Sequence, residues 1–173
     1  MAVLNVRRYG DPILRQKAQP VEAITPEIRK TLTDMLETMY YQVGIGLAAP
    51  QVGVSLRIIL VDDGPRGPRA LLNPAIVDQR GSVRGEEGCL SIPGFFGEVE
   101  RSEWVRVEAM DAEGRPLSFE AKGLQARVIQ HELDHLDGVL FIDRLPPVTR
   151  DRMKKKIQKD GLPEDAPHHA FAL

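Results

Sequence analysis

The 173-residue sequence has a single cysteine, no long apolar run and almost no net charge. One cysteine excludes an internal disulfide and fits a reducing compartment, where a thiolate can bind a metal. Without an apolar stretch of about 20 residues, a transmembrane helix is not expected. The first eight residues also lack the pattern of a signal peptide. A net charge of −2 argues against broad attraction to nucleic acids or membranes. We therefore expect a cytoplasmic protein with no membrane partner and no disulfide partner.

The composition, 42% hydrophobic and 28% charged, suits one soluble domain with a sizeable core. The sequence contains no internal repeat and no low-complexity segment. We predict a single catalytic domain over residues 1–160 and a flexible, proline-containing tail over residues 161–173.

Strand and helix patterns are segregated along the chain, which predicts an α+β fold. Helices are expected from Thr25 to before Gly44, over residues 122–136 and over 148–159. Strands are expected over residues 56–61, from 71 and again from 76 after Asn73-Pro74, over 86–91, over 99–110, and around 117–119. A loop is expected over residues 93–97, and a hairpin turn over 111–114.

The motif H-E-x-x-H is formed by His131, Glu132 and His135. On a helix, residues four apart share a face, so both imidazoles can bind one metal ion. Glu132 lies between them and can act as general base on a water held by that ion. The motif therefore predicts a metallohydrolase.

The third metal ligand is expected upstream of this motif. One class of zinc proteases continues H-x-x-G-x-x-H, but here Phe141, which cannot bind a metal, takes the ligand position. Glu164 and the pair His168–His169 fall in the tail, which has no helical pattern. Cys89, in the run E-G-C-L-S, is the natural candidate. The alternative is that Cys89 is a small buried hydrophobe, as most free cysteines are.

A third segment, from Gly44 to Gln51, places two glycines, two alanines and a glutamine between an expected helix and an expected strand. Alone, it fits a tight packing turn. Together, the patterns G-x-G-x-A-A-x-Q, E-G-C-L-S and Q-H-E-x-D-H occur in the order and at the separations found in one family. The chain resembles peptide deformylase from its first residues to about Lys159, with no departure at a motif position.

The resemblance implies antiparallel β-sheets around a central helix that carries the histidines, followed by a C-terminal helix. It implies an enzyme that removes the N-formyl group from the N-terminal methionine of new polypeptides and releases formate. Cys89, His131 and His135 are then the metal ligands. The side-chain amide of Gln51 and the backbone N–H of Leu90 are the implied donors to the oxyanion.

The substrate polypeptide is expected to lie as an added strand beside Gly44, Ile45 and Gly46, where small residues allow close approach. Leu124 and Val128 are expected on the inner face of the histidine-bearing helix, where they can line an apolar pocket for the methionine.

Two arginines are expected near this site. Arg127 is expected at the rim of the methionine pocket, or else as a solvated surface residue. Arg101 is expected to pair with Glu87, two residues before the cysteine, and so to hold the cysteine strand.

One thiolate and two imidazoles suit zinc, iron, cobalt or nickel. The resemblance implies one divalent ion per chain, with Fe²⁺ in the cell and Zn²⁺, Ni²⁺ or Co²⁺ as replacements in purified protein.

The last expected helix is strongly basic, with six Lys or Arg residues between Arg150 and Lys159. This charge can be a solvated face or a docking surface for ribosomal RNA. The resemblance implies ribosome contact through such a helix in some bacterial members.

Two other functions stay open. A zinc endopeptidase would share H-E-x-x-H, although the downstream ligand is missing. A metal-binding or peptide-binding domain without catalysis would need neither Glu132 nor Gln51.

Overall fold

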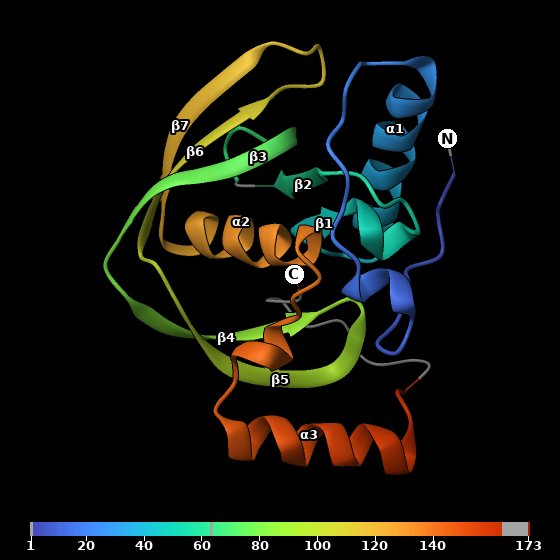
Figure 1. The fold of residues 1–173 in the computed structure, drawn as a ribbon, viewed down its shortest axis with the longest axis vertical. Helices are drawn as coiled ribbons and strands as arrows, with labels where there is room; N and C mark the ends of the chain where they lie inside the picture. The colour runs from blue at the N-terminus through green and yellow to red at the C-terminus, as the bar shows by residue number, and fades with distance from the viewer. Residues whose placement is uncertain (1, 63, 164–172) are drawn as a thin grey trace.

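Two antiparallel sheets enclose one helix, α2, in the computed structural model, which describes residues 2–62, 64–163 and 173 (Figure 1). The larger sheet has the strand order β1-β2-β3-β6-β7, and the smaller one pairs β4 with β5. The strands are β1 (Gly46–Ala48), β2 (Ile58–Asp62), β3 (Pro68–Arg80), β4 (Val83–Cys89), β5 (Ile92–Arg101), β6 (Trp104–Met110) and β7 (Pro116–Lys122). The α-helices are α1 (Pro26–Tyr41), α2 (Gly123–Leu136) and α3 (Pro147–Asp160), with 3-10 turns η1 (Pro12–Arg15), η2 (Ala49–Val52) and η3 (Phe141–Arg144). The predicted α+β class is confirmed.

Helix α1 begins where the sequence predicts. The Thr25 side chain accepts a hydrogen bond from the backbone N–H of Ile28, and Pro26 takes the first helical position. Met35 and Met39 are fully buried, in a core shared with β1 and β2. The helix therefore supports one side of the segment that leads into β1.

Strand β3 is continuous, so the prediction of separate strands from residues 71 and 76 is wrong. Asn73 adopts φ 51°, and the pairing with β6 shifts between Leu72 and Ala75. The Asn73 side chain bonds both the N–H and the C=O of Val21. Asparagine tolerates this left-handed conformation, so Asn-Pro makes a bulge here and does not end the strand.

Two further predictions fail around β5. Residues 93–97 are part of this strand and not a loop, and residues 99–110 are divided between β5 and β6. Gly97 pairs with Glu87 of β4, and a Cβ atom on Gly97 would lie 2.7 Å from Leu145 Cδ2. The glycine therefore serves close packing inside a strand, whereas sequence alone associates glycine with a loop.

Helix α2 runs between the two sheets (Figure 1). Its Val128, Ile129 and Leu136 lie in a core cluster with residues of β2, β3, β6 and β7. Gly138, with φ 74°, follows the end of the helix as predicted. Leu124 is 52% exposed, so its expected place on the inner face is wrong; burial along α2 begins only at Ala126.

Helix α3 packs below the smaller sheet (Figure 1). Its Met153 and Ile157 join a core cluster with Ile92 and Leu145. The predicted flexible tail falls largely on residues 164–172, which lie outside the described residues. Among the described helices, none has the length and apolarity needed to cross a membrane.

Candidate metal centre

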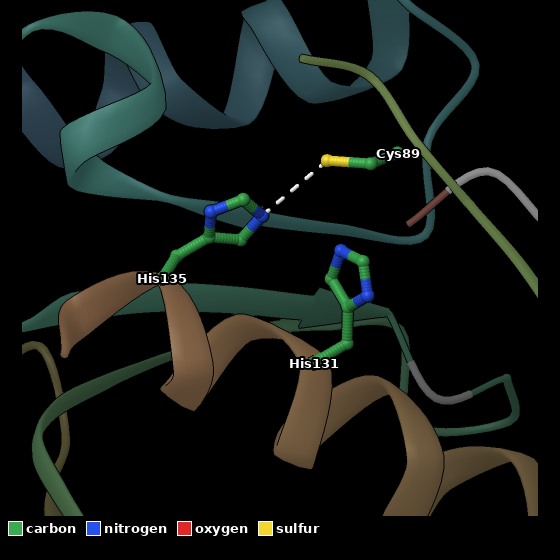
Figure 2. A group of neighbouring side chains, drawn as sticks. All are labelled: Cys89, His131 and His135. Carbon is green, nitrogen blue, oxygen red and sulfur yellow. Dashed lines mark hydrogen bonds between the residues drawn. The ribbon is translucent and has the colours of Figure 1, made fainter. Parts of the chain in front are cut away.

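Cys89, His131 and His135 meet between the smaller sheet and α2. Cys89 is the last residue of β4, and both histidines project from one face of α2 (Figure 2). The three ligand atoms all lie within 4.8 Å of one another, and Cys89 Sγ is 3.4 Å from His135 Nε2. All three side chains are buried. One thiol and two imidazoles at this spacing could hold a divalent metal ion.

Several polar atoms in this cluster are buried without a partner among the described residues. They are His131 Nε2, His135 Nδ1 and both carboxylate oxygens of Glu132. Buried polar atoms are normally hydrogen-bonded, and an unpaired one carries a cost of about 1–3 kcal/mol. A cation in the cluster would satisfy His131 Nε2 and the Glu132 carboxylate, and on His135 it is Nε2, 3.4 Å from Cys89 Sγ, that faces it, so the residues fit a metal ion.

Glu87 orients His131 from behind. Its Oε1 lies 2.9 Å from His131 Nδ1, and both of its oxygens accept hydrogen bonds from Arg101 at 2.9 Å. Burial alone would raise the pKa of Glu87, but the hydrogen bonds from Arg101 and His131 outweigh it and hold the pKa far below its usual range. The predicted Glu87–Arg101 ion pair is thus confirmed.

Burial shapes the protonation states of the other groups. Desolvation, with the negative charges of Glu132 and Glu87, raises the pKa of the Cys89 thiol to about 12. Desolvation also raises the pKa of Glu132 well above its usual value, assisted by the charge of Glu87. The pKa of His135 is lowered by desolvation and by nearby His131. Each shift disfavours charge, so a cation at the centre would be needed to stabilise the thiolate and the carboxylate.

Gln51 lies beside the cysteine. Its Oε1 accepts the backbone N–H of Ala48, which leaves the amide group directed toward Ser91 Oγ at 3.0 Å and Cys89 Sγ at 3.6 Å. These contacts fix the orientation of the amide, with its N–H bonds turned to the centre. The backbone N–H of Leu90 points to the same region, where it donates to the carbonyl oxygen of Leu173.

Glycines just before and at the start of β1 allow this segment to approach Glu132 and Leu90. A Cβ atom on Gly46 would lie 2.6 Å from Glu132 Oε2 and 2.9 Å from Val128 Cγ1. A Cβ atom on Gly44 would lie 3.0 Å from Leu90 Cδ1. Both glycines are therefore required by close packing, and the segment from Gly44 to Gly46 lies against Glu132 and Leu90.

The remaining predicted substrate residues lie in the same region. Ile45 and Val128 belong to one apolar cluster, with Val128 almost fully buried and Ile45 partly so. Leu124 begins α2 and remains half exposed, one turn before Val128.

The expectation for Arg127 is wrong. Arg127 is 7% exposed and donates to Glu87 Oε2 at 2.6 Å and to the carbonyl oxygens of Val83, Gly85 and Val99. It therefore joins β4 to β5 and neutralises Glu87. Its position four residues before His131, on the same helix face, was the available sequence signal.

Sequence reasoning also gave no role to Ser91 and Asp134. Ser91 accepts from Gln51, and Asp134 accepts from Arg101 at 2.6 Å and from Arg144. Both residues stand inside motifs quoted above, and only the fold shows what they contact.

Comparison with known proteins shows the family of this chain. The sequence model described as "Polypeptide deformylase" matches residues 3–151. The chain belongs to the polypeptide deformylase family. It is 51% identical over 162 residues to peptide deformylase of Alkalilimnicola ehrlichii, covering 92% of this chain and 91% of that protein. The matched span contains every residue of the centre, whereas most of α3 lies beyond it.

Solved deformylase structures share the fold. The peptide deformylase of Thermus thermophilus superposes with a TM-score of 0.86 at 47% identity, covering 91% of this chain and 94% of that one. The peptide deformylase of Legionella pneumophila superposes with a TM-score of 0.86 at 41% identity, covering 91% of this chain and 95% of that one.

Proposed function

We propose that Cys89, His131 and His135 hold the divalent metal ion of a peptide deformylase reaction. The chain is a metal-dependent hydrolase that removes the N-formyl group from new polypeptides, as its family does. The observation that supports the ligand assignment is the buried Cys-His-His cluster beside the unpaired carboxylate of Glu132. A metal bound there supplies positive charge, which acidifies water and polarises a carbonyl group.

Glu132 is the proposed general base. Its two oxygens have no partner among the described residues and are held at the centre by the close approach of Gly46. The carboxylate takes a proton from the attacking water and delivers it to the methionine nitrogen as the formyl C–N bond breaks. The products are formate and a free amine.

Gln51 and Leu90 are the proposed donors to the formyl oxygen. The amide of Gln51 is fixed by its bond to Ala48, and the N–H of Leu90 follows directly after the cysteine. Donors held in place before the reaction stabilise negative charge on the carbonyl oxygen without reorganisation.

The polypeptide is proposed to lie beside Gly44, Ile45 and Gly46, with its methionine against Ile45 and Val128. Leu124, half exposed on the first turn of α2, would contact the substrate from the outer side. An exposed apolar residue at the edge of a buried apolar cluster suits such a contact.

Formate release from formyl-Met-Ala by metal-loaded protein tests this function. We expect turnover of the formyl peptide and no cleavage of internal peptide bonds. Cleavage of internal bonds would instead support an endopeptidase, and metal or peptide binding without formate would support a binding domain.

For the metal, we propose Fe²⁺ in the cell, with Zn²⁺, Ni²⁺ or Co²⁺ replacing it in purified protein. The mixed thiolate and imidazole set accepts all four ions, so ligand chemistry does not select one. Metal analysis of protein purified without oxygen tests the assignment. Zinc at full occupancy in such protein, with no iron, would overturn it.

We also propose that the enzyme acts in the cytoplasm and docks on the ribosome through α3. Four basic side chains of this helix are exposed: Arg152, Lys155, Lys156 and Lys159. Met153 and Ile157 face the core, so the charges lie on the outer side. Contacts of such charges with RNA phosphates release counterions and weaken steeply with salt.

Charge reversal tests the docking better than deletion, because removal of α3 would uncover the core around Met153. The variant with Arg152→Glu, Lys155→Glu and Lys159→Glu should lose ribosome co-sedimentation at low salt and keep turnover of a short formyl peptide. The control, Lys17→Glu with Arg29→Glu, changes two exposed basic residues elsewhere. Equal sedimentation of the α3 variant and the wild type would overturn the docking.

A further inference from the structure

Leu173, the last residue of the sequence, lies at the candidate centre. It is 1% exposed and belongs to the core cluster that contains Val128 and Ile129, with Ile45 packed against it. Figure 1 marks this end of the chain over the middle of the molecule, near α2. An apolar side chain of the chain itself is therefore buried in the cluster proposed to receive the substrate methionine.

The backbone of Leu173 is also bound. Its N–H donates to the carbonyl oxygen of Gly88 at 3.2 Å, and its carbonyl oxygen accepts from the N–H of Leu90 at 3.3 Å. Leu173 therefore bonds to Gly88 and Leu90, the two residues that flank Cys89. This is the hydrogen-bond pattern of two parallel strands in which Leu173 lies opposite Cys89. Leu173 thus pairs with the end of β4 through backbone hydrogen bonds, as a bound peptide adds to a strand.

These contacts coincide with those that a substrate needs. The N–H of Leu90 is the proposed donor to the formyl oxygen, and it is engaged by the carbonyl oxygen of Leu173. Val128 and Ile45 are proposed to contact the methionine side chain, and the Leu173 side chain is buried in the apolar cluster to which Val128 belongs and against which Ile45 packs. One residue therefore engages the backbone donor and shares the apolar cluster proposed for the substrate.

We propose that Leu173 is an intramolecular competitor of the formyl-methionyl substrate, an autoinhibitory contact built into the chain. The proposal rests on the substrate site assigned above. Because Leu173 belongs to the same chain as the site, it competes at an effective concentration that does not depend on the concentration of the protein. Substrate binds only the fraction of molecules in which Leu173 has left the site, so the apparent KM rises by the reciprocal of that fraction.

Steady-state kinetics on formyl-Met-Ala with three full-length, metal-loaded variants test the contact. Leu173→Asp places a carboxylate in an apolar cluster, and it should lower KM about 3-fold or more with kcat unchanged. Leu173→Met keeps an apolar side chain of similar volume and should stay within about 2-fold of the wild type. Val148→Asp, a change on an exposed residue of α3, should have no effect.

Hydrogen exchange at the Leu90 amide gives a second readout that does not need turnover. The exchange should be faster in Leu173→Asp than in the wild type and unchanged in Val148→Asp. Unchanged KM and unchanged Leu90 exchange in Leu173→Asp would overturn the proposal. A KM shift that depends on enzyme concentration would overturn the intramolecular contact, because it would mean that Leu173 binds the site of another copy of the chain. Absence of formate release by every variant would instead count against the proposed function, and the exchange experiment would still decide the contact.

Discussion

Glu87 Oε1 lies 2.9 Å from His131 Nδ1, and this contact decides which nitrogen of His131 is free to bind a metal. Hydrogen bonds from Arg101 and His131 hold the pKa of Glu87 far below its usual range, so the carboxylate accepts and Nδ1 donates. Nε2 then carries the lone pair, and it is this atom that has no partner among the described residues.

Glu87→Gln should weaken metal binding about 10–100-fold, because the neutral amide holds the tautomer of His131 less firmly. Competition with a chelator for Co²⁺ or Zn²⁺ measures the affinity. Glu98→Gln, an exposed residue of β5, is the control and should not change it. Equal affinities for wild type and Glu87→Gln would show that His131 is oriented by other contacts.

Arg127→Met should lower the free energy of unfolding by about 3 kcal/mol, since a buried carboxylate and three carbonyl groups lose a donor. Urea unfolding of the metal-free protein measures the change. Arg84→Met, on an exposed side chain of β4, should alter stability by less than about 0.5 kcal/mol. If the two variants have the same free energy of unfolding, the hydrogen bonds of Arg127 contribute little to stability.

The cluster of Cys89, His131 and His135 could be predicted from sequence, but the groups that hold these side chains in place could not. H-E-x-x-H places two ligands by helical periodicity, and the missing downstream ligand points to Cys89. By contrast, the long-range contacts of Arg127 depend on how β4 and β5 lie across α2, which no local pattern encodes. Its expected place, at the rim of the methionine pocket or on the surface, did not take account of Glu87, which lies 40 residues away and provides a buried partner.

The strand boundaries also depend on tertiary contacts that local sequence patterns do not encode. Glycine and proline in residues 93–97 indicate a loop locally, yet pairing with β4 and packing on Leu145 make this segment a strand. At Asn73, the side-chain bonds to Val21 stabilise a bulge within β3. In both places tertiary contacts override local preference. The position of Leu173 is likewise set by contacts with residues far away in the sequence.

Glu132→Ala should keep the metal and lose at least about 10²-fold in kcat, the usual contribution of a general base. Gln51→Ala should also keep the metal, with a loss of about 10²–10³-fold from the missing donor. Metal content and formate release on the same samples measure both effects. Asp137→Asn, an exposed residue paired with Arg57, is the control. Near-normal turnover of fully loaded Glu132→Ala would exclude Glu132 as the base.

Gly46→Ala should impair catalysis more than stability. The added Cβ would lie 2.6 Å from Glu132 Oε2 and 2.9 Å from Val128 Cγ1, so these two side chains must move while the backbone can stay. A displacement of about 1 Å at a reacting group can cost about 10²-fold in rate. Gly44→Ala meets only the end of the Leu90 side chain, at 3.0 Å, and should have a smaller effect on kcat. Steady-state kinetics and thermal unfolding of both variants test this prediction. An equal loss of kcat in Gly46→Ala and Gly44→Ala would contradict it.

Metal affinity should rise with pH because of Cys89. Desolvation raises the pKa of its thiol to about 12, so the metal-free protein keeps this proton throughout the neutral range. The pKa of His135 is lowered by desolvation, so this ligand is already neutral and releases no proton. Since metal binding must displace the thiol proton, the apparent association constant should increase about tenfold per pH unit from Cys89.

Titration with Zn²⁺ between about pH 6.5 and pH 8.5 measures this slope, because both limits lie well below the raised thiol pKa. Cys89→Asp replaces the thiol with a group that loses its proton more readily, and its slope should be shallower. An affinity that does not change with pH in the wild type would mean that the thiolate exists before the metal arrives. In that case neighbouring groups, and not the ion, would stabilise its charge, and the unpaired atoms of His131 and Glu132 would need another explanation.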